Sequence, residues 1–60
     1  MNKDTFNKLT IDEQLKFFNK ELKKGNSLSV ICKSIGIGRS TVSDRFKKKN
    51  YKFNKNTNQY

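Results

Sequence analysis

The chain has 60 residues, enough for one small domain whose core gives it only marginal stability. Fourteen Lys and Arg residues against five Asp and Glu give a formal net charge of +9, and 32% of the residues are hydrophobic. One Cys and no His exclude an intrachain disulfide, a zinc site built from Cys and His, and a nucleophile activated by His. We therefore expect no cofactor, no metal site and no enzymatic activity.

The positive charge is concentrated in the second half of the chain. Residues 1–30 hold six Lys and four acids, whereas residues 31–60 hold six Lys, two Arg and one acid. Such an asymmetric field favours a polyanionic partner. The longest apolar run, Val30-Ile31-Cys32, is far too short for a membrane span, and no apolar signal segment opens the sequence. We expect a cytoplasmic protein without a membrane partner, which suits a free thiol.

Residues 1–9 are mostly polar and predict a frayed end, with Phe6 and Leu9 packed on the helices that follow. The first predicted helix covers about residues 11–24, and Thr10 and Glu13 fit a capping box at its start. Its apolar stripe, with spacings of +4, +3 and +4, consists of Ile11, Leu15, Phe18 and Leu22. Gly25 is expected to end this helix.

A second, shorter helix is predicted at about residues 28–35, capped by Asn26 or Ser27. Its apolar residues share one face at i, i+3, i+4 and i+7, and they are Leu28, Ile31, Cys32 and Ile35. Gly36 follows at once, where a helix end favours a left-handed residue. Gly38 can cap a third helix at about residues 39–49, which directs Val42 and Phe46 inward. Two short helices joined by a glycine turn are the helix-turn-helix pattern.

The segment Gly36-Ile37-Gly38-Arg39-Ser40-Thr41-Val42 closely resembles the turn and the start of the recognition helix in the DNA-binding domains of serine recombinases, the invertases and resolvases. Phe46 matches an aromatic residue of Hin-type invertase domains, and the resemblance covers about residues 15–47. Many bacterial transposase and repressor domains share the pattern. The chain departs from it at Cys32, where Ala is usual, and at Asp44, an acid on a face that should meet an anion. The resemblance implies double-stranded DNA as the partner.

The outward side of the third helix is expected to read base edges in the major groove, through Arg39, Ser40, Ser43, Asp44 and Lys47. Arg39 suits a bidentate contact with guanine. Asp44 either accepts a hydrogen bond from a cytosine amino group or forms an ion pair with a lysine one turn on, and we favour the ion pair. Phosphate contacts are expected from Ser27, Ser29, Lys33, Thr41, Arg45, Lys48, Lys49, Lys52 and Lys55.

Residues 51–60 predict a small β-hairpin that pairs Tyr51 with Tyr60 and Phe53 with Asn58 around a two-residue loop. The alternative is a disordered basic tail. The expected fold class is therefore mainly α: a single three-helix helix-turn-helix domain over residues 1–60, with a hairpin wing or a tail at its end.

The function expected from these features is sequence-specific binding of double-stranded DNA, as a repressor or as a plasmid partition or replication factor. One small domain offers little contact area, so a homodimer or tandem copies on repeated half-sites are expected. The alternatives are the DNA-binding part of a recombinase or transposase, a binder of RNA or single strands, and a protein-interaction module.

Overall fold

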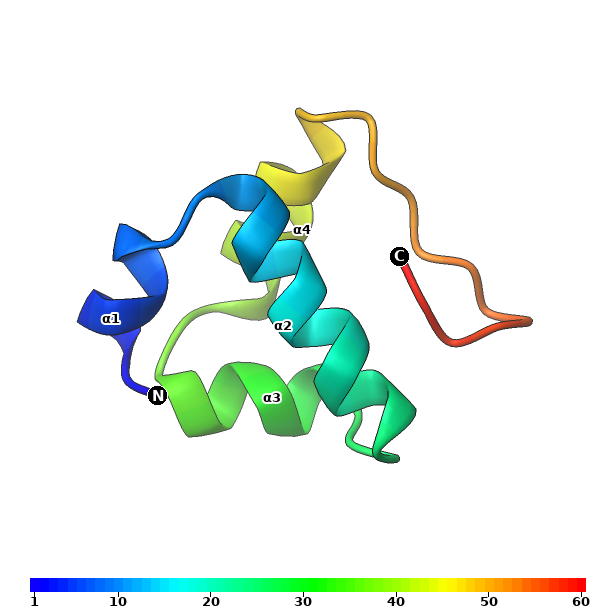
Figure 1. Ribbon diagram of the computed structural model, residues 1–60, viewed down its shortest axis with the longest axis horizontal. Helices are drawn as coiled ribbons and strands as arrows, with labels where there is room; N and C mark the ends of the chain where they lie inside the picture. Colours follow the sequence, from blue (N-terminus) through cyan, green and yellow to red (C-terminus); the bar gives the residue numbers. More distant parts are fainter.

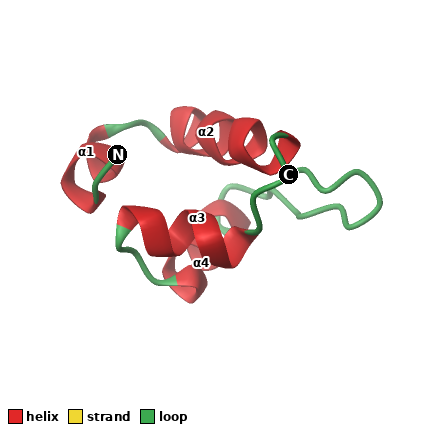
Figure 2. Cartoon of the chain, turned by 90° about the horizontal axis from the view of Figure 1, so that it is seen from below, coloured by secondary structure: helices red, strands yellow, loops and turns green.

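Four helices and a non-helical C-terminal segment make up the computed structural model, which describes residues 1–60 and contains no strand. The helices are α1 (Lys3–Lys8), α2 (Ile11–Lys23), α3 (Leu28–Ile35) and α4 (Arg39–Lys47). Helices α2, α3 and α4 pack against one another, with α1 at one end and the C-terminal segment at the other (Figures 1 and 2). The chain is thus a small, mainly helical domain, and the three central helices lie where the sequence predicts them.

Hydrogen bonds confirm the predicted caps at the starts of α2 and α3. The Thr10 hydroxyl accepts from the Glu13 amide at 3.2 Å, and the Glu13 carboxylate accepts from the Thr10 amide at 3.0 Å. These bonds hold the pKa of Glu13 below its usual range. Ser27 caps α3 by accepting from the Val30 amide at 3.2 Å. Both caps satisfy amides that the helix itself leaves without partners.

Two helices are followed by a glycine with left-handed backbone, as the sequence predicts. These are Gly25 (φ +100°) after α2 and Gly36 (φ +85°) after α3. After Gly36, the Ile37 amide donates to the Cys32 carbonyl at 3.1 Å, which satisfies a terminal carbonyl of α3. A Cβ at Gly36 would meet no atom within 4 Å, so glycine is required there by the backbone conformation and not by lack of space.

The hydrophobic core lies between α2, α3 and α4 and consists of Phe6, Phe18, Leu22, Ile31, Cys32, Ile35, Ile37, Val42 and Phe46. Aromatic rings form a chain through it. Phe6 contacts Phe17 and Phe18 at centroid distances of 6.1 and 5.6 Å, and Phe18 contacts Phe46 at 5.5 Å. The inward placement of Phe46 is confirmed, since it is fully buried. Edge-on packing of this kind adds to the burial of apolar area.

The N-terminal residues form a helix that the sequence prediction missed. Asn2 caps α1 by accepting from the Thr5 amide at 2.9 Å, and Asp4 lies in the first turn, where the helix dipole favours an acid. Phe6 is fully buried, so the expected packing on the bundle is confirmed but the expected fraying is wrong. Six residues are less than two turns, which is too short for an apolar period to appear.

The predicted hairpin register is wrong. The only pairing in residues 51–60 is an isolated antiparallel bridge between Asn54 and Gln59, with N–O distances of 2.7 and 3.3 Å. Tyr60 does not pair with Tyr51; its ring packs on Phe46 at 4.9 Å. Burial of this aromatic ring against the core takes the place of a strand ladder, because a two-stranded hairpin alone gains little stability.

Candidate nucleic-acid interface

The outward face of α4 carries all five residues that the sequence assigns to base contacts. Arg39, Ser40, Ser43, Asp44 and Lys47 are exposed in the structure. On the opposite side of the same helix, Val42 is 1% exposed and Phe46 is 0% exposed. The two inward side chains therefore fix which side of α4 faces the solvent, because rotating the helix would expose them.

The link between α3 and α4 is short and well anchored. It consists of three residues, Gly36, Ile37 and Gly38, and Ile37 is buried at 8% exposure between two exposed glycines. Gly38 precedes α4 with φ −69° and ψ 138°, and no side chain caps the first amides of the helix. The buried Ile37 side chain holds the turn on the core, so α3 and α4 are held at a defined angle.

Two hollows flank the outward face of α4 and gather most of the predicted contact residues. The first has a volume of about 390 Å³ and brings together Arg39, Ser43, Lys47 and Lys52 from α4 and the C-terminal segment. The second lies beside the start of α2 and brings together Thr41, Asp44, Arg45, Lys48 and Lys49. Ser40, Lys33 and Lys55 are exposed and line neither hollow.

Almost all of the positive charge is free of carboxylate partners. The one ion pair in the domain joins Lys24 and Glu21 at 3.4 Å, on α2. Asp44 therefore pairs with neither Lys47 nor Lys48, and the interpretation that we favoured for it, an ion pair within α4, is wrong. The Asp44 carboxylate is exposed and open to an outside donor.

Arg39 is held toward α3 by a hydrogen bond. Its Nη1 donates to the Ser29 hydroxyl at 3.3 Å, across the turn between the two helices. Ser29 is exposed, as are the other expected phosphate contacts apart from Arg45: Ser27, Lys33, Thr41, Lys48, Lys49, Lys52 and Lys55. The bond restricts the guanidinium without burying it, which lowers the entropy that a later contact would cost.

Arg45 makes contacts within the domain that the sequence does not predict. Its Nη1 donates to the side-chain oxygens of Gln14, at 3.0 Å, and Asn7, at 3.1 Å. Gln14 is 1% exposed, and its Nε2 donates to the carbonyls of Phe6 and Leu9 at 3.1 and 3.0 Å. Arg45 thus joins α4 to α1 and α2 through Nη1, and its contact with a DNA phosphate stays a prediction.

The C-terminal segment is fastened to α2, a relationship that the sequence analysis did not foresee. Asn19 holds its end: the Asn19 side-chain oxygen accepts from the Tyr60 amide at 2.8 Å, and its carbonyl accepts from Gln59 Nε2 at 3.1 Å. The Tyr51 hydroxyl donates to Asp12 at 2.7 Å, and this bond raises the pKa of Tyr51. These contacts place Lys52 beside α4.

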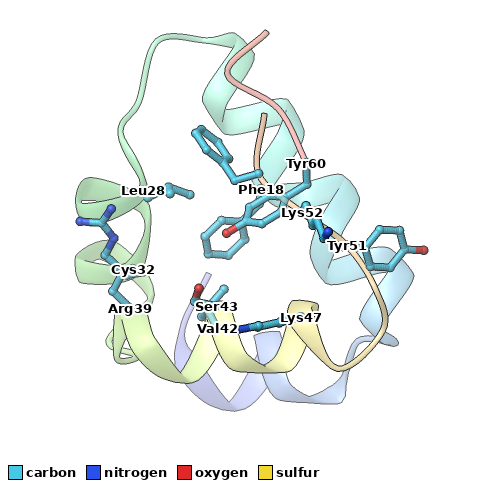
Figure 3. A pocket seen from close by; sticks show the side chains of 11 residues that line it. Phe18, Leu28, Cys32, Arg39, Val42, Ser43, Lys47, Tyr51, Lys52 and Tyr60 are labelled. Atoms are coloured by element: carbon cyan, nitrogen blue, oxygen red, sulfur yellow. The ribbon is translucent and has the colours of Figure 1, made fainter. Parts of the chain in front are cut away.

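The apolar residues that line the first hollow include Phe18, Leu28, Cys32, Val42, Phe53 and Tyr60. Phe18, Leu28, Val42 and Tyr60 can be followed in Figure 3. Burial raises the pKa of the Cys32 thiol and of the Tyr60 phenol, so both groups stay protonated at neutral pH. The Tyr60 hydroxyl points into the hollow, whereas the Tyr51 ring is turned away from it (Figure 3).

Comparisons with known proteins give no assignment: no family model matches the chain, and no curated protein or solved structure matches it significantly. None of the four helices combines the length and the hydrophobicity that a transmembrane span needs. The function has to be inferred from the residues and their arrangement.

Proposed function

We propose that the chain is a sequence-specific binding domain for double-stranded DNA, in which α3 and α4 form a helix-turn-helix and α4 enters the major groove. The observation that carries the proposal is the division of α4 into two sides. Val42 and Phe46 are buried beneath it, and five polar or charged residues are exposed above it. A rigid helix with short polar side chains and one Arg near its start suits the edges of base pairs.

The exposed side chains of α4 offer hydrogen-bond donors and acceptors that can match those of base edges. Arg39 offers a planar pair of donors that fits guanine, Ser40 and Ser43 both donate and accept, and Asp44 accepts only. Because Asp44 has no ion pair within the domain, an amino group of cytosine could serve as its donor. A face that was simply a solubilising surface would have no need of short hydroxyl side chains beside an unpaired acid.

The unpaired lysines supply the backbone contacts in this proposal. Lys48 and Lys49 follow the outward face at one end of α4, and Lys52 lies beside its other flank. Each Lys that meets a phosphate releases counterions, so binding should weaken steeply as salt rises. A domain of this size buries about 600–1,000 Å² on DNA, so a homodimer or adjacent copies on repeated half-sites would be needed for high affinity.

A single-strand or RNA binder is supported less well. Such a protein uses exposed aromatic rings as stacking surfaces for bases. Here Tyr51, Phe53 and Tyr60 are half-buried, and the Tyr60 ring already packs on Phe46 and Phe53, at 4.9 and 5.3 Å. A base could stack on Tyr60 only after the C-terminal segment had moved.

The test is a gel-shift titration of the 60-residue chain against random duplex DNA, random single strands and duplex RNA across a salt series, followed by selection of bound duplexes from a random library. We expect a preference for duplex DNA, a steep salt dependence and an enriched motif. The spacing of half-sites in the motif would give the stoichiometry and would help to separate a repressor, a partition or replication factor and part of a recombinase. Equal or tighter binding of single strands, or a library without enrichment, would contradict the proposal.

A further inference from the structure

The hollow between α4 and the C-terminal segment has the makeup of a ligand site. Its volume of about 390 Å³ lies within the range of small-molecule pockets. Seven of its eleven lining residues are hydrophobic, and the other four are three cations and a hydroxyl: Arg39, Lys47, Lys52 and Ser43. No Asp or Glu side chain lines it, although the domain has five of these residues.

We propose that this hollow binds a small organic anion with an aromatic or branched apolar body, such as an aryl carboxylate. The apolar body would lie on Leu28, Phe53 and Tyr60, which line the hollow and are half-buried. The anionic group would face the exposed cations at the rim. The charge of the lining favours this class of ligand. A neutral apolar ligand would gain nothing from the three cationic side chains, and a cationic ligand would be repelled by them.

The Tyr60 side chain adds a fixed donor to the site. Its ring is held against Phe46 and Phe53, and its hydroxyl points into the hollow (Figure 3). The phenol is desolvated and stays protonated, so it can donate to a carboxylate. The amide of the same residue is held by Asn19 at 2.8 Å, which keeps the ring in place before a ligand arrives.

Occupation of the hollow would affect DNA binding, a consequence that rests on the proposed function. Arg39, Ser43 and Lys47 line the hollow and also belong to the face of α4 proposed to read bases. An anion held by Arg39 and Lys47 takes the positions that guanine or phosphate oxygens would occupy. The ligand and DNA are therefore expected to compete, and the ligand acts as an inducer that releases the DNA.

The binding test uses 1-naphthoate as the probe and follows backbone amide shifts by NMR in the full chain. About 13 non-hydrogen atoms predict a Kd on the order of 1 mM. We expect saturable shifts centred on Leu28, Ser43 and Tyr60, and much weaker binding of the neutral isostere 1-naphthamide. Equal binding of the amide, or small shifts spread over all surface lysines, would overturn the proposal.

Charge variants sharpen the test without disturbing the core. The double variant Lys47→Gln/Lys52→Gln removes two rim cations and should weaken 1-naphthoate binding by about fivefold to tenfold. The matched control Lys16→Gln/Lys20→Gln makes the same change of charge on exposed residues of α2, outside the hollow, and should leave the Kd within about twofold. An equal loss in both variants would show general attraction to a basic protein and refute the site.

A competition assay links the site to DNA. At saturating 1-naphthoate, the affinity for a selected duplex should fall at least fivefold, whereas 1-naphthamide should leave it unchanged. If the chain binds the probe in the hollow but shifts no duplex, the ligand site stands and the proposed DNA-binding function fails. If DNA binding is seen and the probe does not bind, the ligand site alone is wrong.

Discussion

The guanidinium of Arg45 and the side-chain oxygen of Gln14 lie 3.0 Å apart and join the outer helix α4 to the middle of the bundle. The amide of Gln14 also donates to two carbonyls at the end of α1, so one buried side chain connects three helices. A buried amide is stable only when its polar atoms have partners, and here its nitrogen and its oxygen both do.

Gln14→Ala is expected to lower the free energy of unfolding by about 1–3 kcal/mol, because it removes two hydrogen bonds to the carbonyls of Phe6 and Leu9 and the buried acceptor of Arg45. Asn7→Ala removes only the exposed acceptor of Arg45 and should cost less than about 1 kcal/mol. Urea unfolding followed by circular dichroism gives both values. Equal effects of the two substitutions would contradict the assigned role of Gln14.

Gly36→Ala should destabilise the domain by about 1–2 kcal/mol, the cost of a left-handed residue that carries a Cβ. Gly38→Ala is the matched control, because its φ of −69° suits any residue and its added Cβ would contact only the exposed Thr41 side chain, at 3.3 Å. We expect a change within about 0.5 kcal/mol at Gly38. Thermal melts that ranked the two variants in the opposite order would refute the strain argument.

Phe46→Ala removes a fully buried ring that contacts Phe18 and Tyr60, and it should cost about 3–5 kcal/mol through cavity formation. Val30→Ala truncates an apolar side chain that is 54% exposed and should cost under about 1 kcal/mol. The melting temperatures of the two variants check the prediction. A wild-type melting temperature for Phe46→Ala would show that α4 does not depend on this anchor.

Arg39→Ala should reduce the preference for the selected duplex by about 1–3 kcal/mol and change random-duplex binding much less. Lys48→Ala should weaken binding to every duplex and reduce the slope of log K against log salt by about one unit. Lys20→Ala, on an exposed position of α2 outside the proposed interface, serves as the charge control. Equal losses on selected and random duplex for Arg39→Ala would exclude its base contact.

The two tyrosines of the C-terminal segment predict a response to alkaline pH. The hydrogen bond to Asp12 raises the pKa of Tyr51, and burial raises the pKa of Tyr60. A raised pKa in the folded state stabilises the segment below the ordinary value of about 10, and this contribution is lost as the pH rises through the folded pKa. Tyrosinate absorbance should therefore titrate at a higher pH in the folded chain than in urea. Tyr51→Phe leaves Tyr60 as the single tyrosine reporter, and coinciding curves for that variant would contradict the burial of Tyr60.

The sequence predicted the parts of this fold that depend on local pattern. The apolar spacings gave the three central helices, and Gly36 gave the turn before α4 because a left-handed residue there has few alternatives. The exposed face of α4 followed from the inward pair Val42 and Phe46. All five residues expected on that face are exposed.

The parts that the sequence could not predict depend on contacts between distant residues. Gln14 lies three residues after Ile11 and four before Phe18, so it falls on the apolar stripe, but its polar side chain gave no reason to expect burial. Arg45 looked like a surface cation because its partner was not recognised. The register of the C-terminal segment was missed because Tyr60 docks on Phe46, and no local signal reports that contact.

The single bridge between Asn54 and Gln59 has a consequence for the order in which the domain opens. Without a ladder, the amides of residues 51–60 should exchange with deuterium far sooner than those of α2, which are released only by global unfolding. Each such opening would uncover the edge of Phe46 while α4 stays in place. The molecule would then exist briefly as its four helices without the docked C-terminal segment, and the lifetime of this state sets how quickly anything can reach the space beneath Tyr60.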